Sequence, residues 1–175
     1  SPALARLGDF RCLPKATPVP APLEALLEAE LPPGDGWQFE PKWDGFRCLA
    51  RRDGNEVTLT SKSGKPLGRY FPDVVAMLEG LKEKEFLLDG ELIIPVDDAL
   101  SFEELQLRLH PAESRVRKLA AAHPAEFMLF DALVIGGKDL SAEPLSKRRK
   151  ALEKLFAKID AAGLHLSPVT YDRET

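Results

Sequence analysis

A lysine followed closely by an aspartate, a glycine and an arginine is the first feature of the sequence that could do chemistry. It stands in the stretch Glu40-Pro41-Lys42-Trp43-Asp44-Gly45-Phe46-Arg47. A lysine amine becomes a nucleophile only after losing its proton, and desolvation or neighbouring cations favour that neutral form. Gly45 permits a close approach to the backbone, and Arg47 offers a planar fork for phosphate oxygens or a ribose. A hairpin with a surface Lys42–Asp44 pair explains this stretch equally well.

Two acidic residues interrupt a later apolar run, Phe86-Leu87-Leu88-Asp89-Gly90-Glu91-Leu92-Ile93-Ile94. Side chains alternate along a strand, so Asp89 and Glu91 share one face. Because a buried carboxylate is costly unless it is paired, hydrogen-bonded or metal-bound, this pattern indicates contact with a ribose or a metal. The alternative is a β-bulge at Gly90 that leaves both acids exposed.

An aromatic residue beside an acid forms the third candidate, in Phe127-Met128-Leu129-Phe130-Asp131-Ala132-Leu133. Phe130 could stack on a purine, while Phe127 and Leu129 pack in the core. From this segment alone, a core position for Phe130 is the simpler interpretation.

Periodicity and turn signals locate the strands and helices that must position these side chains. The expected strands are 37–42, 46–52, 57–60, 86–95, 127–135 and 164–169, with a hairpin turn at Asp53-Gly54. The expected helices are 23–30, 72–79, one capped by Ser101, one from Pro111 to before Pro124, and one capped by Ser146. Phe102, Leu105 and Leu109 are expected to share a face of the first Ser-capped helix, and Leu152, Leu155, Phe156 and Ile159 a face of the second. Strands and helices mix without a regular βαβ rhythm, which predicts an α+β fold with mainly antiparallel sheets.

Composition narrows the class of protein. A chain of 175 residues that is 44% hydrophobic is the size of one domain with a real core. It contains neither a membrane-length apolar run nor a signal-peptide pattern, and its two cysteines are too few for a disulfide framework or a zinc cluster. A reducing cytoplasm is the expected location. Residues 1–22 contain five of the prolines and are expected to form an N-terminal arm.

The net charge of −4 is unusual for a protein that binds nucleic acid. A local basic surface can still attract DNA, and one basic run exists at Lys147-Arg148-Arg149-Lys150, followed by Lys154 and Lys158. Its simplest interpretation is the solvated face of a helix, and its alternative is a DNA-facing surface.

Taken in order, the three segments resemble motifs I, III and IIIa of the covalent nucleotidyltransferases, which include DNA ligases, RNA ligases and mRNA capping enzymes. The matching residues are Lys42, Asp44, Gly45 and Arg47 for motif I, Asp89-Gly90-Glu91 for motif III, and Phe130-Asp131 for motif IIIa. The presence of Glu40 two residues before the lysine is typical of the ligases.

The resemblance is narrower still, to bacterial ATP-dependent DNA ligases and especially the small repair enzymes called ligase C. It extends over roughly residues 32–173 and includes Tyr70-Phe71-Pro72-Asp73 and the stretch from Leu109 to Arg117. It implies an ATP-grasp-like nucleotidyltransferase fold of two mainly antiparallel sheets flanked by helices, with the adenylation domain in residues 23–175. The site is expected in a cleft between the sheets.

The resemblance also implies a role for each site residue. Lys42 would attack ATP and become lysyl-AMP, and the AMP would pass to the 5′-phosphate of a DNA nick before sealing. Phe130 would stack on adenine, Glu91 would hold the ribose or a divalent ion, and Glu40 would lie at the adenine edge. Asp44, Gly45, Arg47 and Lys62 complete the expected nucleotide site. The expected cofactors are ATP and Mg²⁺ (or Mn²⁺). The protein is expected to be a monomer, to be associated with the bacterial nucleoid, and to bind nicked double-stranded DNA.

Two departures from the family pattern affect these expectations. The sequence has Ser61-Lys62 where the family usually has Ser-Arg, and lysine lacks the bidentate fork of arginine. Motifs IV and V and the oligonucleotide-binding-fold domain are not found before Thr175. The chain is therefore expected to be part of a longer enzyme and to be weak or inactive alone.

Other classes of protein share part of this motif pattern. An RNA ligase or a capping enzyme would use the same lysine chemistry, an NAD-dependent ligase would carry a dedicated N-terminal region, and a degenerate member would only bind nucleic acid. Intact Lys42, Glu91 and Phe130 argue against the last of these.

Overall fold

The computed structural model describes residues 37–171, so the expected N-terminal arm and the expected helix 23–30 lie outside the described residues. Its elements in chain order are β1 Phe46–Asp53, β2 Glu56–Ser61, η2 Gly68–Tyr70, α1 Pro72–Glu79, β3 Glu85–Ile93, β4 Pro95–Val96, β5 Ala99–Leu100, α2 Phe102–Arg108, α3 Glu113–Ala122, β6 Glu126–Ile135, β7 Lys138–Asp139, α4 Leu145–Phe156 and β8 Leu164–Leu166. Within residues 37–171, every helix is too short or too polar to cross a membrane.

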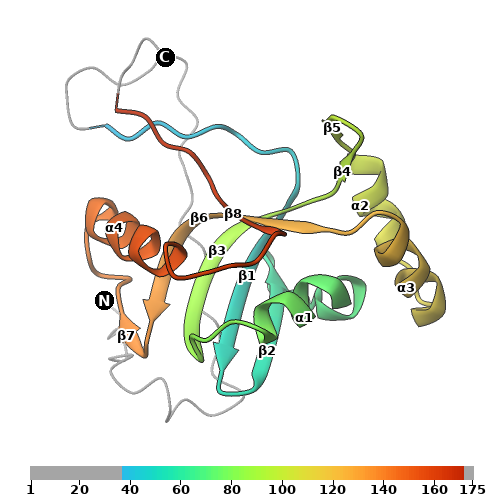
Figure 1. Cartoon of the computed structure of the whole chain (residues 1–175), viewed down its shortest axis with the longest axis horizontal. Helices are drawn as coiled ribbons and strands as arrows, with labels where there is room; N and C mark the ends of the chain where they lie inside the picture. Colours follow the sequence, from blue (N-terminus) through green and yellow to red (C-terminus); the bar gives the residue numbers. More distant parts are fainter. Residues whose placement is uncertain (1–36, 172–175) are drawn as a thin grey trace.

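A six-stranded sheet forms the centre of the molecule (Figure 1). Its strands are ordered β2-β1-β3-β6-β7, and β8 also pairs with β6. β8 runs parallel to β6, while the other pairings of the described strands are antiparallel. A second sheet consists of β4 and β5. The expected α+β fold is confirmed, and the parallel strand is an addition to it.

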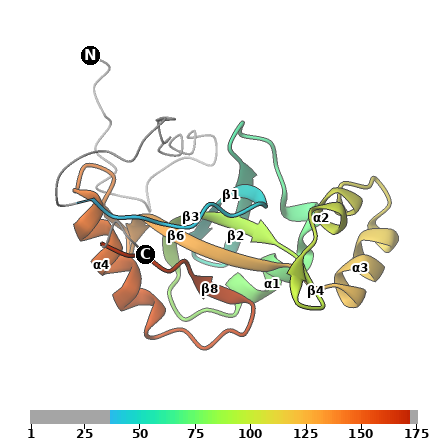
Figure 2. The ribbon, with the colours of Figure 1, turned by 90° about the horizontal axis from the view of Figure 1, so that it is seen from above.

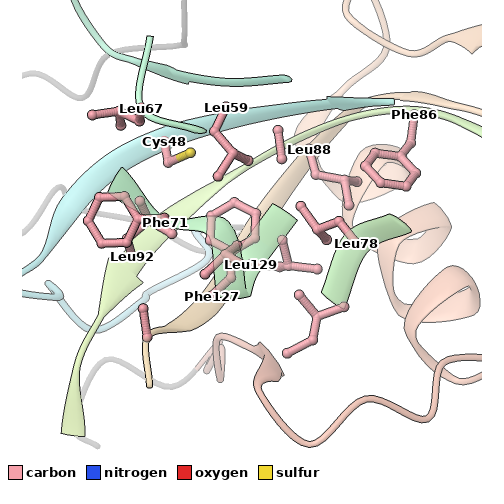
Figure 3. Close-up of a cluster of buried hydrophobic side chains, with 14 of the residues drawn as sticks. Cys48, Leu59, Leu67, Phe71, Leu78, Phe86, Leu88, Leu92, Phe127 and Leu129 are labelled. Carbon is pink, nitrogen blue, oxygen red and sulfur yellow. The ribbon is translucent and has the colours of Figure 1, made fainter. Parts of the chain in front are cut away.

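One face of the large sheet carries the main hydrophobic core. Alternating residues of β1, β3 and β6 point toward α1, whose Val74 and Leu78 are fully buried against them. Figure 3 shows this cluster, in which the core members include Cys48, Phe86, Leu88, Leu92, Phe127 and Leu129. The intervening residues of the same strands face the other way, and there the candidate site lies.

Helices α2 and α3 lie together at one end of the sheet (Figures 1 and 2). Arg108, at the end of α2, is fully buried and holds them to α1. Its guanidinium donates to both carboxylate oxygens of Asp73 at 3.0 and 2.8 Å and to the backbone carbonyls of Tyr70 and His123. A buried arginine satisfied in this way fixes one orientation of the helices.

Local signals predicted several boundaries correctly. α1 begins at Pro72 and ends before Gly80, and the Ser101 hydroxyl accepts a hydrogen bond from the Glu104 backbone at the start of α2. The hairpin between β1 and β2 is present, with its turn one residue later, at Gly54-Asn55. Gly54 has a φ of +62°, which glycine adopts without strain.

Other expectations were wrong. Residues 37–42 do not form a strand, because Pro41 has no N–H to donate and only Phe39 bridges to Thr170. α4 begins after Pro144 rather than at a Ser146 cap, and it ends before Ile159. In α2, Leu105 is buried, whereas Phe102 and Leu109 are largely exposed. The expected strand 164–169 is confined to Leu164–Leu166.

Candidate active site

Arg47 is the centre of the polar cluster on the second face of the sheet. It lies on β1 and donates to the two carboxylate oxygens of Asp89 on β3 at 2.7 and 2.6 Å. The Asp89 side chain is only 1% exposed, so burial raises its pKa, while the hydrogen bonds from Arg47 oppose that rise. The two acids of β3 are therefore not exposed at a bulge, although the pairing of β3 with β6 is irregular beside Gly90.

Phe130 is not a core residue. It is half-buried, and the guanidinium carbon of Arg47 lies 4.7 Å from the centre of its ring. Its neighbours Phe127 and Leu129 are fully buried, as expected. The register shift opposite Asp89 and Gly90 places Phe130 at the irregular point of β6. This shift presents an aromatic face beside a cation on the side of the sheet away from the core.

Glu91 lies directly opposite Arg47 in the pairing of β1 with β3. Its Oε2 atom is buried and has no hydrogen-bond partner among the residues that the structure describes. Burial raises the pKa of Glu91 to about 7, with the negative charges of Asp89 and Asp44 adding to the rise and Arg47 opposing it. A buried carboxyl oxygen without a partner in such a position is suited to a hydroxyl group or a cation.

The loop that carries Glu40, Lys42 and Asp44 runs beside this cluster into β1. Lys42 and Asp44 are exposed. The Gln38 side chain donates to Glu40 at 2.6 Å, and burial raises the pKa of Glu40 against the positive charges of Arg149 and Arg47. At the end of the loop, a Cβ on Gly45 would collide with the carbonyl oxygen of Leu92, so the chain enters β1 through a position that only glycine fills without a shift.

Lys62 lines an open groove that also includes Arg47. This open groove has a volume of about 1020 Å³ and extends from Arg47 along the turn after β2 to η2. Its charged lining residues are Arg47, Lys62, Lys65 and Arg69, and none of the described residues that line it is acidic. In a chain of net charge −4, this concentration of positive charge favours an anionic ligand.

The basic run on α4 is only partly the solvated face expected from the sequence. Arg148 and Arg149 are buried, at 7% and 4% exposure. Arg148 donates to both carboxylate oxygens of Asp131 at 2.9 and 3.1 Å, and Arg149 donates to the carbonyl of Ser167 at 2.8 Å. Lys147 and Lys150 are exposed, so only part of the run faces solvent.

Sequence reasoning did not single out two further residues at the site, Trp43 and Ser167. The indole Nε1 of Trp43 donates to the Ser167 hydroxyl at 2.9 Å across a separation of 124 residues. No local pattern marks such a contact, because each residue is unremarkable within its own segment.

These groups together suit a nucleotide. An aromatic face can take a base, a carboxyl group with an unused oxygen can take a sugar hydroxyl, and a guanidinium can take a phosphate. Lys42 adds an amine on the adjacent loop. The arrangement therefore has the components for nucleophilic attack on a bound nucleoside phosphate.

Comparison with known proteins gives consistent matches. DNA ligase C2 of Mycolicibacterium smegmatis is 45% identical, over 93% of this chain and 45% of its own length. DNA ligase C of Mycobacterium tuberculosis is 43% identical, over 93% of this chain and 46% of its own length. The bifunctional non-homologous end joining protein LigD of Bacillus subtilis is 34% identical, over 87% of this chain and 26% of its own length. The chain thus spans less than half of these relatives.

A comparison with solved structures and a family model also match DNA ligases. A solved structure of mycobacterial DNA ligase D complexed with ATP and MES superposes with a TM-score of 0.59 and 28% identity, over 75% of this chain and 39% of that one. The family described as "ATP dependent DNA ligase domain" matches residues 16–174. The chain therefore belongs to the family of ATP-dependent DNA ligase domains.

Proposed function

We propose that this chain is the part of a DNA ligase that carries the adenylated lysine, with Lys42 as the residue that becomes attached to AMP. The observation that carries the proposal is the juxtaposition of Arg47, Glu91 and Phe130 on one face of the sheet, beside the loop of Lys42. Each of these residues matches the motif position that the family uses for the nucleotide.

The reaction begins at the Lys42 amine. Once neutral, its nitrogen attacks the α-phosphorus of ATP, an N–P bond forms, the bond to the β-phosphate oxygen breaks and pyrophosphate leaves. The AMP then passes from lysine to the 5′-phosphate of a nick. Attack by the 3′-hydroxyl joins the strands and releases AMP, in the repair role that the ligase C and LigD relatives suggest.

The nucleotide would be held by the neighbouring side chains. Phe130 would stack on adenine and Glu91 would accept a ribose hydroxyl at its unused oxygen. Glu40 would lie at the adenine edge, and Arg47 would contact ribose or phosphate from its position over Phe130. Asp44 and Gly45 shape the approach to β1.

A magnesium ion would be held mainly by ATP. Residues 37–171 contain no cluster of three or more side chains with the usual metal-ligating groups. The buried Oε2 of Glu91, which has no hydrogen-bond partner among the described residues, is a donor of the kind that Mg²⁺ takes, because this ion keeps several waters and binds one or two carboxylates together with substrate phosphates. Glu91 is the proposed protein ligand as the alternative to its ribose contact, since both would use Oε2. When bound, the ion would offset charge on the phosphates during transfer.

Nicked double-stranded DNA is the proposed partner, and the basic groove beside Arg47 is the proposed contact. Lys62 lies there at the motif position usually held by arginine, and its single charge would serve as a point contact to a phosphate. Arg148 and Arg149 are buried and are not proposed as DNA contacts.

Labelling of the full-length gene product with ATP tests the central proposal. Incubation with ATP and Mg²⁺ should give a single AMP adduct at Lys42 by mass spectrometry, and the adduct should be acid-labile and alkali-stable, as a phosphoramidate is. Lys42→Ala and Lys42→Arg should abolish it, because guanidinium remains protonated. Labelling by GTP in place of ATP would identify a capping-type enzyme, and an adduct elsewhere would overturn the assignment.

A further inference from the structure

The loop that carries Lys42 is attached to the protein at few points. Among residues 37–171, no backbone hydrogen bond holds residues 40–44 to the sheet. Phe39 exchanges two backbone hydrogen bonds with Thr170 before the loop, at 2.8 and 3.0 Å, and β1 begins after it, at Phe46. Between these ends, the hydrogen bond from Trp43 to Ser167 is the tie closest to the lysine.

Ser167 makes three hydrogen bonds in different directions and is fully buried. Its N–H donates to the carbonyl of Leu129 at 2.7 Å, its hydroxyl accepts from Trp43, and its carbonyl accepts from Arg149 at 2.8 Å. Leu129 immediately precedes Phe130 on β6. Ser167 therefore joins the Lys42 loop to the strand that carries the proposed adenine-stacking residue.

Arg149 fixes Ser167 from the side of α4. Its side chain is 4% exposed, and its Nε donates to Glu153 at 2.9 Å while Nη2 donates to Ser167. A buried guanidinium that reaches a backbone carbonyl restricts that carbonyl to one position. The backbone of Ser167 is thus bonded to α4, and its hydroxyl accepts the hydrogen bond from Trp43.

We infer that Ser167, held by Arg149, is a positioning residue for Lys42 and acts through the indole of Trp43. The inference rests on the proposed adenylation of Lys42. An in-line attack requires the nucleophilic nitrogen and the α-phosphate to be aligned within a narrow range. Ser167 is hydrogen-bonded both to the Lys42 loop, through Trp43, and to β6, through Leu129. It would therefore set the distance between the Lys42 amine and the bound nucleotide without contacting either of them.

Two mild substitutions test this. Trp43→Phe removes the N–H and keeps an aromatic ring, and Ser167→Ala removes the hydroxyl. Each should lower the kcat of Lys42 adenylation about fivefold, the effect of one lost hydrogen bond. The KM for ATP should stay within about twofold of wild type, because the proposed ATP contacts remain. Ser114→Ala, at an exposed serine on α3, is the matched control and should leave both constants unchanged.

The double variant separates positioning from general destabilisation. If the two residues act through one bond, Trp43→Phe combined with Ser167→Ala should be about fivefold slower than wild type, rather than the product of the single effects, about 25-fold. Three outcomes would overturn the inference, provided that the Lys42 adduct still forms. They are a wild-type kcat in both single variants, a double variant slowed by the product of the two single effects, and a change in the KM for ATP with no change in kcat. If wild-type protein formed no adduct at Lys42, the proposed function itself would fail.

Discussion

Arg47 and Asp89 form a two-point ion pair across β1 and β3, with donor–acceptor distances of 2.7 and 2.6 Å and a carboxylate that is almost fully buried. The pair holds the guanidinium over the ring of Phe130. Asp89 would thereby act on the proposed nucleotide site through Arg47, because both of its carboxylate oxygens are bonded to that guanidinium.

Asp89→Asn should weaken this arrangement. Loss of one charge from a buried pair should lower the free energy of unfolding by about 2–3 kcal/mol, somewhat less than for a fully buried pair because Arg47 is partly exposed. Displacement of the guanidinium should raise the KM for ATP by about tenfold. Urea unfolding and adenylation kinetics measure the two effects. Asp53→Asn is the control, because the Arg51–Asp53 pair is longer, at 3.8 Å, and more exposed; it should change stability by less than about 0.5 kcal/mol.

Glu91 should make stability depend on pH. Its pKa rises from 4.5 to about 7 on folding, so the folded state favours the protonated carboxyl. The stability contributed by that proton is complete below about pH 4.5 and is lost as pH rises through about 7. Glu91→Gln, which resembles the protonated form, should therefore flatten the pH profile of unfolding across this range.

Above about pH 7, Glu91→Gln should be more stable than wild type by on the order of 1 kcal/mol, after allowance for the partial exposure of the site. Unfolding free energies from urea titrations at several pH values provide the measurement. Glu103→Gln, at an exposed position on α2, should retain the wild-type profile. An identical profile for Glu91→Gln and wild type would contradict the burial of this carboxyl.

The basic groove should contribute to DNA binding in the full-length protein. Lys65→Gln should weaken binding to a nicked duplex and reduce the slope of log affinity against log salt by about 1, as expected for the loss of one phosphate contact. Titrations at several salt concentrations measure both quantities. Lys150→Gln, on the exposed side of α4, is the control and should bind like wild type; the opposite order would place the DNA on α4.

Arg148 should contribute to the free energy of unfolding and should not contribute to DNA binding. Arg148→Met leaves the carboxylate of Asp131 buried without its cation, which should cost about 3–5 kcal/mol. Replacing both partners, Arg148→Met with Asp131→Leu, should recover much of that loss because no buried charge remains. Chemical unfolding compares the variants. A reduced salt dependence of DNA binding with unchanged stability would restore the DNA-facing interpretation of this helix.

Short-range signals in the sequence were sufficient for much of the fold. Pro72 and Gly80 mark α1, Ser101 and Glu104 mark the start of α2, and these signals act within one or two helical turns. The acids inside apolar strands likewise identified Asp89 and Glu91, because burial of a carboxylate demands a partner.

Long-range contacts were not predictable in this way. The sequence of α4 looks like a solvated basic helix, yet Arg148 is buried because β6 supplies Asp131 as its partner. Residues 37–42 looked like a strand, but the strand partner available to them extends over one bridge only. The parallel pairing of β8 also depends on a neighbour distant in sequence.

The hydrogen bond between Trp43 and Ser167 has a consequence for how the protein is made. Its two residues are 124 positions apart, so the loop of Lys42 is synthesised long before the residue that restrains it. A nascent chain that has emerged only as far as β6 already carries Arg47, Glu91 and Phe130 but lacks this restraint. During translation, this restraint on the loop of Lys42 therefore forms only after the segment that follows α4 has left the ribosome.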